Sequence, residues 1–203
     1  MPAWFKEGGV MMYPLLLCSI VSLGVILERF FSLNRTRKEN QSLARKVRKA
    51  ISEGQPEKAA ALCQESNAPI SFIFAKGLQK KLRPKEEVEK AMEDEASHQV
   101  PIMEKFLPAL AIITGISPLI GFLGTVAGLY RAFMDIVGAG GVTSTSTVAS
   151  GIAEALITTV AGLVIAIPTL IFHGYFISKV NIMVLEMERE SMELIELLKK
   201  EQV

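Results

Sequence analysis

Glu154 is the one formally charged residue in an apolar stretch of 31 residues, 147–177. A carboxylate within a membrane-spanning helix costs about 2.5–3.5 kcal/mol on insertion scales, so such a group tends to face a bundle interior or a hydrated cavity. Thr158 and Thr159 follow it, and a hydroxyl both donates and accepts hydrogen bonds, which suits a chain of water molecules. These residue types predict an ion path, most simply for protons. The alternative is a Glu near a helix end that reaches the membrane interface.

The threonines around Glu154 strengthen the prediction as a set. Helix periodicity places Glu154 and Thr158 on one face, because they are four residues apart, and offsets Thr159 by roughly 140°. Thr125 adds a hydroxyl from an earlier apolar stretch. A single threonine in a membrane helix more often forms a hydrogen bond between helices than lines an ion path. The predicted proton-pathway and pore-lining residues are Glu154, Thr125, Thr159 and Thr158.

Three apolar stretches are long enough to cross a bilayer, which takes about 20 helical residues. They are residues 8–27, 106–130 and 147–177. Between the first two lies a charged segment in which apolar residues recur at helical spacing and prolines punctuate the helices. The sequence therefore predicts an all-α membrane protein with three transmembrane helices that are extended by cytoplasmic helices.

Basic residues after the first span predict the orientation. Eight of them follow it: Arg29, Arg35, Arg37, Lys38, Arg45, Lys46, Arg48 and Lys49. The positive-inside rule keeps such a block in the cytoplasm, so we expect an external N-terminus and a cytoplasmic C-terminus. The predicted segments are an external N-terminal segment 1–9, transmembrane helix 10–33, cytoplasmic helical region 34–105, transmembrane helix 106–137, external loop 138–147, transmembrane helix 148–179 and cytoplasmic C-terminal helix 180–203.

Small residues in the second and third spans predict close helix packing. Small side chains four apart let helix backbones approach, which is how many transmembrane helices associate. Two prolines lie within these spans and can kink them. The predicted helix-packing residues are Gly121, Gly124, Gly128, Gly162, Pro118 and Pro168. So many small faces favour a homo-oligomer, with a compact monomeric hairpin as the alternative.

Two segments carry a resemblance to a known family. Residues 117–129 (SPLIGFLGTVAGL) and 152–168 (IAEALITTVAGLVIAIP) are similar to the two membrane signatures of the MotA/TolQ/ExbB proton channel family, closest to its ExbB and TolQ branch. Residues 28–30 and 54–78 also resemble that branch. The resemblance covers nearly the whole chain. Three predicted spans, where the flagellar MotA branch has four, make that branch a poorer match.

The resemblance implies a homo-oligomeric ring, a pentamer of three-helix subunits in the bacterial inner membrane. The ring would enclose two copies of an ExbD-like or TolR-like single-span partner, whose membrane aspartate carries protons. The assembly would couple proton flow to work at the outer membrane, either import energisation or envelope maintenance, with a TonB-like or TolA-like protein. The chain would be the pore-forming stator subunit. The family's intramembrane Glu and pore threonines correspond to Glu154, Thr125 and Thr159.

Other functional classes remain as alternatives. A membrane scaffold that holds a single-span partner without conducting ions would use the same polar groups as links between helices. A stand-alone transporter is a poorer match, because no inverted repeat is visible. His98 and His173 lack neighbours at metal-site or catalytic spacing, so we expect no enzyme activity, metal or cofactor. The net charge of +1 gives no indication of nucleic-acid binding.

Overall fold

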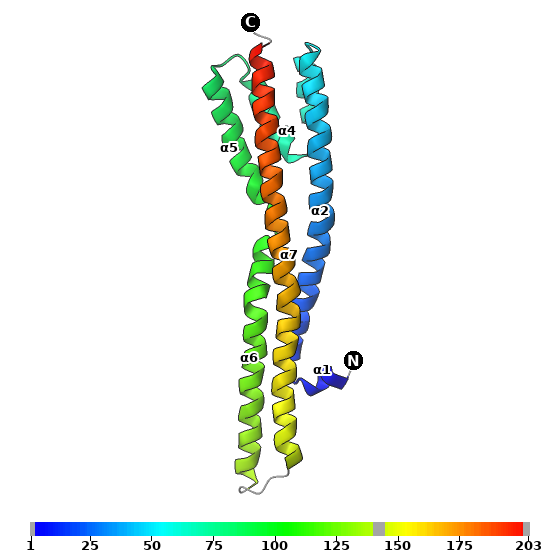
Figure 1. The fold of residues 1–203 in the computed structure, drawn as a ribbon, viewed down its shortest axis with the longest axis vertical. Coiled ribbons are helices and arrows are strands. Elements are labelled where there is room, and N and C mark those ends of the chain that lie inside the picture. Colours follow the sequence, from blue (N-terminus) through cyan, green and yellow to red (C-terminus); the bar gives the residue numbers. More distant parts are fainter. Residues whose placement is uncertain (1–2, 140–144, 201–203) are drawn as a thin grey trace. The chain divides into compact units, whose positions relative to one another are not determined.

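The computed structural model describes residues 3–139 and 145–200, and their regular structure is entirely helical (Figure 1). Residues 140–144 of the predicted external loop lie outside the described residues. The helices are α1 (Ala3–Glu7), α2 (Met12–Ser52), α3 (Pro56–Gln64), α4 (Pro69–Gln79), α5 (Lys85–Met103), α6 (Leu107–Gly138) and α7 (Thr145–Lys200). The all-α prediction is confirmed.

Three helices are long and apolar enough to cross a membrane. They are α2, α6 and, within α7, the part Val148–Lys200. Both α2 and α7 run on without interruption past the predicted ends of their spans at residues 33 and 179. No proline or glycine stands at either position, so nothing in the chain ends the helix there. α2 ends instead just before the sequence Glu53-Gly54-Gln55-Pro56.

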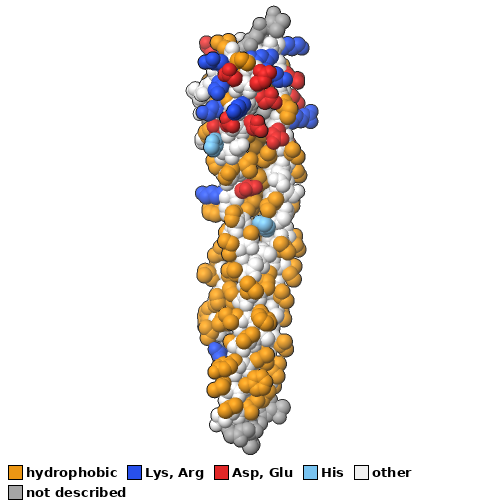
Figure 2. Space-filling model, turned by 90° about the vertical axis from the view of Figure 1, so that its left-hand side faces the viewer, with side chains coloured by type: hydrophobic (Ala, Val, Ile, Leu, Met, Phe, Trp, Pro, Cys, Tyr) orange, Lys and Arg blue, Asp and Glu red, His pale blue; other side chains and the backbone are white. Residues whose placement is uncertain are grey.

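The chain divides into two compact units. The first, called the apolar unit, comprises Met1–Glu28 and Phe106–Tyr175. The second, called the charged unit, comprises Arg29–Lys105 and Phe176–Val203. Hydrophobic side chains cover the visible face of the apolar unit, and Lys, Arg, Asp and Glu side chains gather on the charged unit (Figure 2). Each unit is described separately below.

In the apolar unit, α6 and α7 lie antiparallel with their backbones very close, and glycines line the contact. A Cβ atom at Gly121 would lie 3.1 Å from Thr159 Cα, and one at Gly128 would lie 3.0 Å from the Gly151 carbonyl oxygen. A Cβ at Gly162 would lie 2.6 Å from the Ser117 carbonyl oxygen. We call this contact the glycine seam. A larger side chain at these positions would push the two helices apart.

The outer surface of the apolar unit is strongly hydrophobic. Large apolar side chains remain exposed there, including Leu119 at 66%, Phe122 at 63%, Phe133 at 65% and Leu156 at 60%. Contiguous apolar surface of this kind is unusual on a monomeric soluble protein. A helical segment with such a surface is suited to lipid or to neighbouring helices, because its backbone polar groups are satisfied internally.

The charged unit has an ordinary buried core. α2 contributes Ala44 and Val47, which are fully buried, and α4 contributes Ile73 and Phe74. α4 packs against both α3 and α5. Burial raises the pKa of the Cys63 thiol in α3 to about 11, because an apolar environment disfavours the thiolate.

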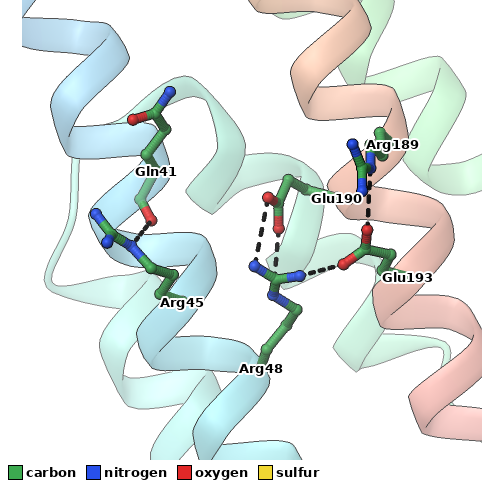
Figure 3. Close-up of polar contacts among 6 residues, drawn as sticks. All are labelled: Gln41, Arg45, Arg48, Arg189, Glu190 and Glu193. Atoms are coloured by element: carbon green, nitrogen blue, oxygen red, sulfur yellow. Dashed lines mark hydrogen bonds and ion pairs between the residues drawn. The ribbon is translucent and has the colours of Figure 1, made fainter.

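Ion pairs join α2 and α7 across the charged unit (Figure 3). Arg48 Nε lies 3.3 Å from Glu190 Oε2, and the Arg48 guanidinium also pairs with Glu193. Arg189 reaches Glu193 Oε1 from the same helix at 3.1 Å. One arginine of α2 therefore contacts two carboxylates that α7 places three residues apart, and it reduces the repulsion between them.

The glycine seam predicts a large difference between two similar substitutions in α7. Gly162→Ala should destabilise the protein by about 1–3 kcal/mol, because the new methyl group overlaps the backbone of α6. Gly174→Ala, the matched control, has no atom within 4 Å of its added Cβ and should be neutral or stabilising. Thermal unfolding of the detergent-solubilised chain measures both. Equal melting temperatures for the two variants would contradict the close seam.

The Arg48 contacts predict a similar contrast in the charged unit. Arg48→Gln should cost about 1–3 kcal/mol, since it leaves the buried Glu190 Oε2 atom without its cation. Arg35→Gln removes a pair within α2 that is 81% exposed on its arginine side, and should leave the free energy of unfolding nearly unchanged, because solvent screens such a pair. The same unfolding assay compares them. If Arg35→Gln lowered the free energy of unfolding as much as Arg48→Gln, the ion pairs between α2 and α7 would contribute no more to stability than an exposed pair within one helix.

Candidate functional site

Glu154 lies on α7 and forms an ion pair with α6. Arg131 Nη1 donates a hydrogen bond to Glu154 Oε1 at 2.9 Å. The Glu154 side chain is 23% exposed and the Arg131 side chain is 53% exposed. Arg131 precedes the α6 end at Gly138 by seven residues, or roughly 10 Å along the helix. The pair therefore lies within the candidate span Leu107–Gly138, toward its Gly138 end, and an isolated charge of either sign is costly in such a helix.

The turn between α1 and α2 also lies against Glu154. Gly9 has φ +65°, and a Cβ at this position would lie 2.7 Å from Glu154 Cδ and still closer to Oε1. Gly8 is close to the same helix, since its Cβ would lie 3.1 Å from Ile157 Cγ2. Only glycine combines this φ with so little space. The carboxylate is thus enclosed by α6 on one side and by the N-terminal turn on another.

Thr125 of α6 and Thr159 of α7 meet at the glycine seam. Their hydroxyls are hydrogen-bonded to each other. Thr125 Oγ1 is 3.2 Å from the Ala155 carbonyl oxygen, and Thr159 Oγ1 is 3.2 Å from the Gly121 carbonyl oxygen. Each hydroxyl has one proton to donate, so one threonine donates to the other and the second donates to a carbonyl. Both side chains are half-buried, and their remaining lone pairs can accept hydrogen bonds from water.

Thr158 is placed differently from its neighbour. It is 1% exposed, and its hydroxyl donates within α7, with the Ala155 carbonyl oxygen at 2.9 Å and the Glu154 carbonyl oxygen at 3.1 Å. A Cβ at Gly124 would meet this side chain directly, 2.6 Å from Thr158 Cβ. Thr158 therefore fills the seam between the two helices.

The glycine seam separates the predicted site residues into two groups. Thr159 follows the buried Thr158 by one residue and Glu154 precedes the buried Ala155 by one residue, so they point to opposite flanks of α7 at about 100° per residue. The Thr125–Thr159 pair occupies one flank, and the Glu154–Arg131 pair occupies the other. Within one chain, the structure brings the two threonines together and keeps them apart from Glu154.

Arg131 is the member of this site that the sequence reasoning did not identify. Its sequence neighbour Asp135, four residues later on the same helix face, is the more obvious partner for an ion pair. The signal was nevertheless available, because Arg131 directly follows the second apolar stretch, 106–130, and Glu154 lies within the third. Such charges are commonly paired in a membrane.

Comparison with known proteins shows which family this chain resembles. Residues 65–189 match the MotA/TolQ/ExbB proton channel family. The chain is 33% identical over 170 residues to an ExbB-like biopolymer transport protein of Synechocystis, covering 83% of this chain and 81% of that protein. It is 34% identical over 176 residues to the biopolymer transport protein ExbB of Neisseria meningitidis serogroup A, covering 79% and 78%.

A shorter match connects the chain to TolQ proteins of the same family. It is 40% identical over 92 residues to the Tol-Pal system protein TolQ of Haemophilus influenzae, covering 45% of this chain and 40% of that protein. The family consists of channel proteins, not enzymes. With three candidate spans and a family match over more than half of its length, the chain is a multi-pass membrane protein that belongs to the MotA/TolQ/ExbB proton channel family.

Proposed function

We propose that this chain is the pore-forming stator subunit of a motor in the bacterial inner membrane that is driven by the proton-motive force. The observation that carries the proposal is the Thr125–Thr159 hydroxyl pair at the glycine seam of a proton channel family member. Two adjacent hydroxyls with free lone pairs can bind water and pass a proton along it. Family membership also implies an ExbD-like or TolR-like partner.

The division of labour follows from what the chain supplies. The stator wall contributes hydroxyls and a rigid helix pair, and the single-span partner contributes a membrane aspartate that takes up and releases the proton. Moving one charge through 100 mV yields about 2.3 kcal/mol, which is enough to bias a conformational cycle. The relatives' names, biopolymer transport protein and Tol-Pal system protein, favour work at the outer membrane through a TonB-like or TolA-like protein.

The assembly we propose is a homopentamer around two copies of the partner. The exposed apolar side chains of the apolar unit give it surface for neighbouring copies as well as lipid. In the proposed orientation the N-terminus is periplasmic, and the charged unit, with the basic block that begins at Arg29, is cytoplasmic.

A second candidate is a scaffold that holds its partner without conducting protons. The burial of Thr158 and its hydrogen bonds within α7 favour this reading for at least one of the predicted path residues. In a scaffold every polar group of the apolar unit would serve only to join helices. Two sets of variants separate this candidate from a stator.

Thr159 provides the first test. Thr159→Val has nearly the same shape and no hydroxyl, whereas Thr159→Ser keeps the hydroxyl. In liposomes that contain the chain with its single-span partner, proton uptake measured with a trapped pH-sensitive dye should fall about tenfold or more for Thr159→Val, a barrier change of about 1.4 kcal/mol. Thr159→Ser should retain most of the flux. A scaffold predicts no difference between the two variants.

Glu154 provides the second test, and its ion pair dictates the design. Glu154→Gln also breaks the ion pair with Arg131, so a loss of flux in this variant alone could come from the missing ionisable carboxyl or from the displaced Arg131 guanidinium. The double variant Arg131→Gln, Glu154→Gln removes both charges and keeps a polar side chain at each position. We expect proton uptake to stay low in the double variant, because the ionisable carboxyl is absent. Normal flux in the double variant would remove Glu154 from the proton path.

A further inference from the structure

The Glu154 carboxylate is enclosed by two structural elements that are far apart in the sequence. Arg131 of α6 holds Oε1 at 2.9 Å, and the backbone of Gly9 lies against the same carboxylate. Among the described side chains, Arg131 is the cation within ion-pair distance of Glu154. The N-terminal turn thus rests on a charged pair at the surface of the α6–α7 hairpin.

The turn itself is tightly defined. The Gly8 N–H donates to the Trp4 carbonyl oxygen at 3.1 Å, which ends α1, and the Met12 N–H donates to the Gly9 carbonyl oxygen at 3.2 Å, which begins α2. Gly9 adopts φ +65° between them, a conformation that other residues rarely adopt. The position of α1 is therefore linked through two glycines to the position of the Glu154 side chain.

The ion pair is the part of this arrangement that depends on charge. Arg131 and Glu154 are each costly in an apolar span, and together they neutralise each other. If Glu154 loses its charge, the guanidinium loses the counter-charge that holds it against Glu154, and its long side chain gains more from reaching water or the Asp135 carboxylate four residues along α6. The carboxyl group is then no longer held in the orientation against which Gly9 packs.

We propose that the Glu154–Arg131 pair holds the α1–α2 turn in its packed position against α7, which we call the seated position. Neutralising Glu154 then releases the N-terminal segment from this position. Arg131 is a positioning residue in this arrangement, since it acts through Glu154. The connection to proton passage rests on the proposed function, in which the Glu154 carboxylate would be protonated as a proton passes. The seated position itself does not depend on that function.

The segment that would move carries its own reporter. Trp4 is the single tryptophan of the chain, and with Phe5 it lines a groove of about 500 Å³ that also includes Leu156 and Val160 of α7. Phe5 is 7% exposed and anchors α1 in a cluster with Met12 and Leu15. Trp4 lies in this groove when the turn is packed against α7, so release of the turn should change the surroundings of the indole and raise its access to a water-soluble quencher.

Acrylamide quenching of Trp4 tests the proposal on the full-length chain in lipid nanodiscs. Glu154→Gln and Arg131→Gln should each increase quenching, with the ratio of unseated to seated turn rising by up to about fivefold, the factor that a partly exposed ion pair supplies. Arg131→Lys keeps the positive charge and should quench close to the unsubstituted chain. Gly9→Ala should also increase quenching, whereas Gly24→Ala, with no atom within 4 Å of its added Cβ, should not.

Phe5→Ala serves as the positive control, because it removes the apolar anchor of α1. If Phe5→Ala raises quenching and neither Glu154→Gln nor Arg131→Gln does, the proposal is overturned. An effect of Arg131→Gln without one of Glu154→Gln also overturns it, because the seated position requires both charges. The assay needs no partner and no proton gradient. If Glu154→Gln releases the turn but leaves proton flux undiminished, only the proposed function is contradicted. If Glu154→Gln abolishes flux but leaves the turn in its packed position, only the role of the ion pair in holding the turn is contradicted.

Discussion

The close approach of α6 and α7 is the constraint on which the rest of the apolar unit depends. At Gly128 and Gly162 the added Cβ would fall within 3.0 Å of a backbone oxygen of the facing helix, so the two backbones touch with no side chain between them. Lipid tails are as apolar as the helices, and close packing of this kind is what holds transmembrane helices together. The Thr125–Thr159 and Arg131–Glu154 contacts between α6 and α7 depend on it.

Because the two helices touch, the residues on either side of the seam face different surroundings. One flank brings Thr125 and Thr159 close enough to share a hydrogen bond. The other brings Arg131 and Glu154 together under the N-terminal turn. A wider spacing would separate both pairs. In the ring that we propose, each subunit would present the hydroxyl pair on one flank of α7 and the ion pair on the other. A proton passage that used both pairs would therefore be formed between neighbouring subunits.

Electrostatics acts differently in the two units. In the charged unit Arg48 pairs with Glu190 and Glu193, and Glu193 has a second cationic partner in Arg189. In the apolar unit the surrounding lipid offers neither charge of the Glu154–Arg131 pair a partner, so each depends on other groups of the protein.

The sequence by itself determined the helical class, the three candidate spans and the family, because long apolar runs and small-residue spacing are properties of the chain that need no tertiary information. It also singled out Glu154, since a lone charge in an apolar run is visible in one dimension. Only the tertiary structure decided that Arg131 is its partner, that Thr158 is buried in the seam and that Gly9 lies on the carboxylate. Those outcomes depend on how one helix is rotated and shifted against another, and helical periodicity fixes the face of each residue without fixing what that face meets.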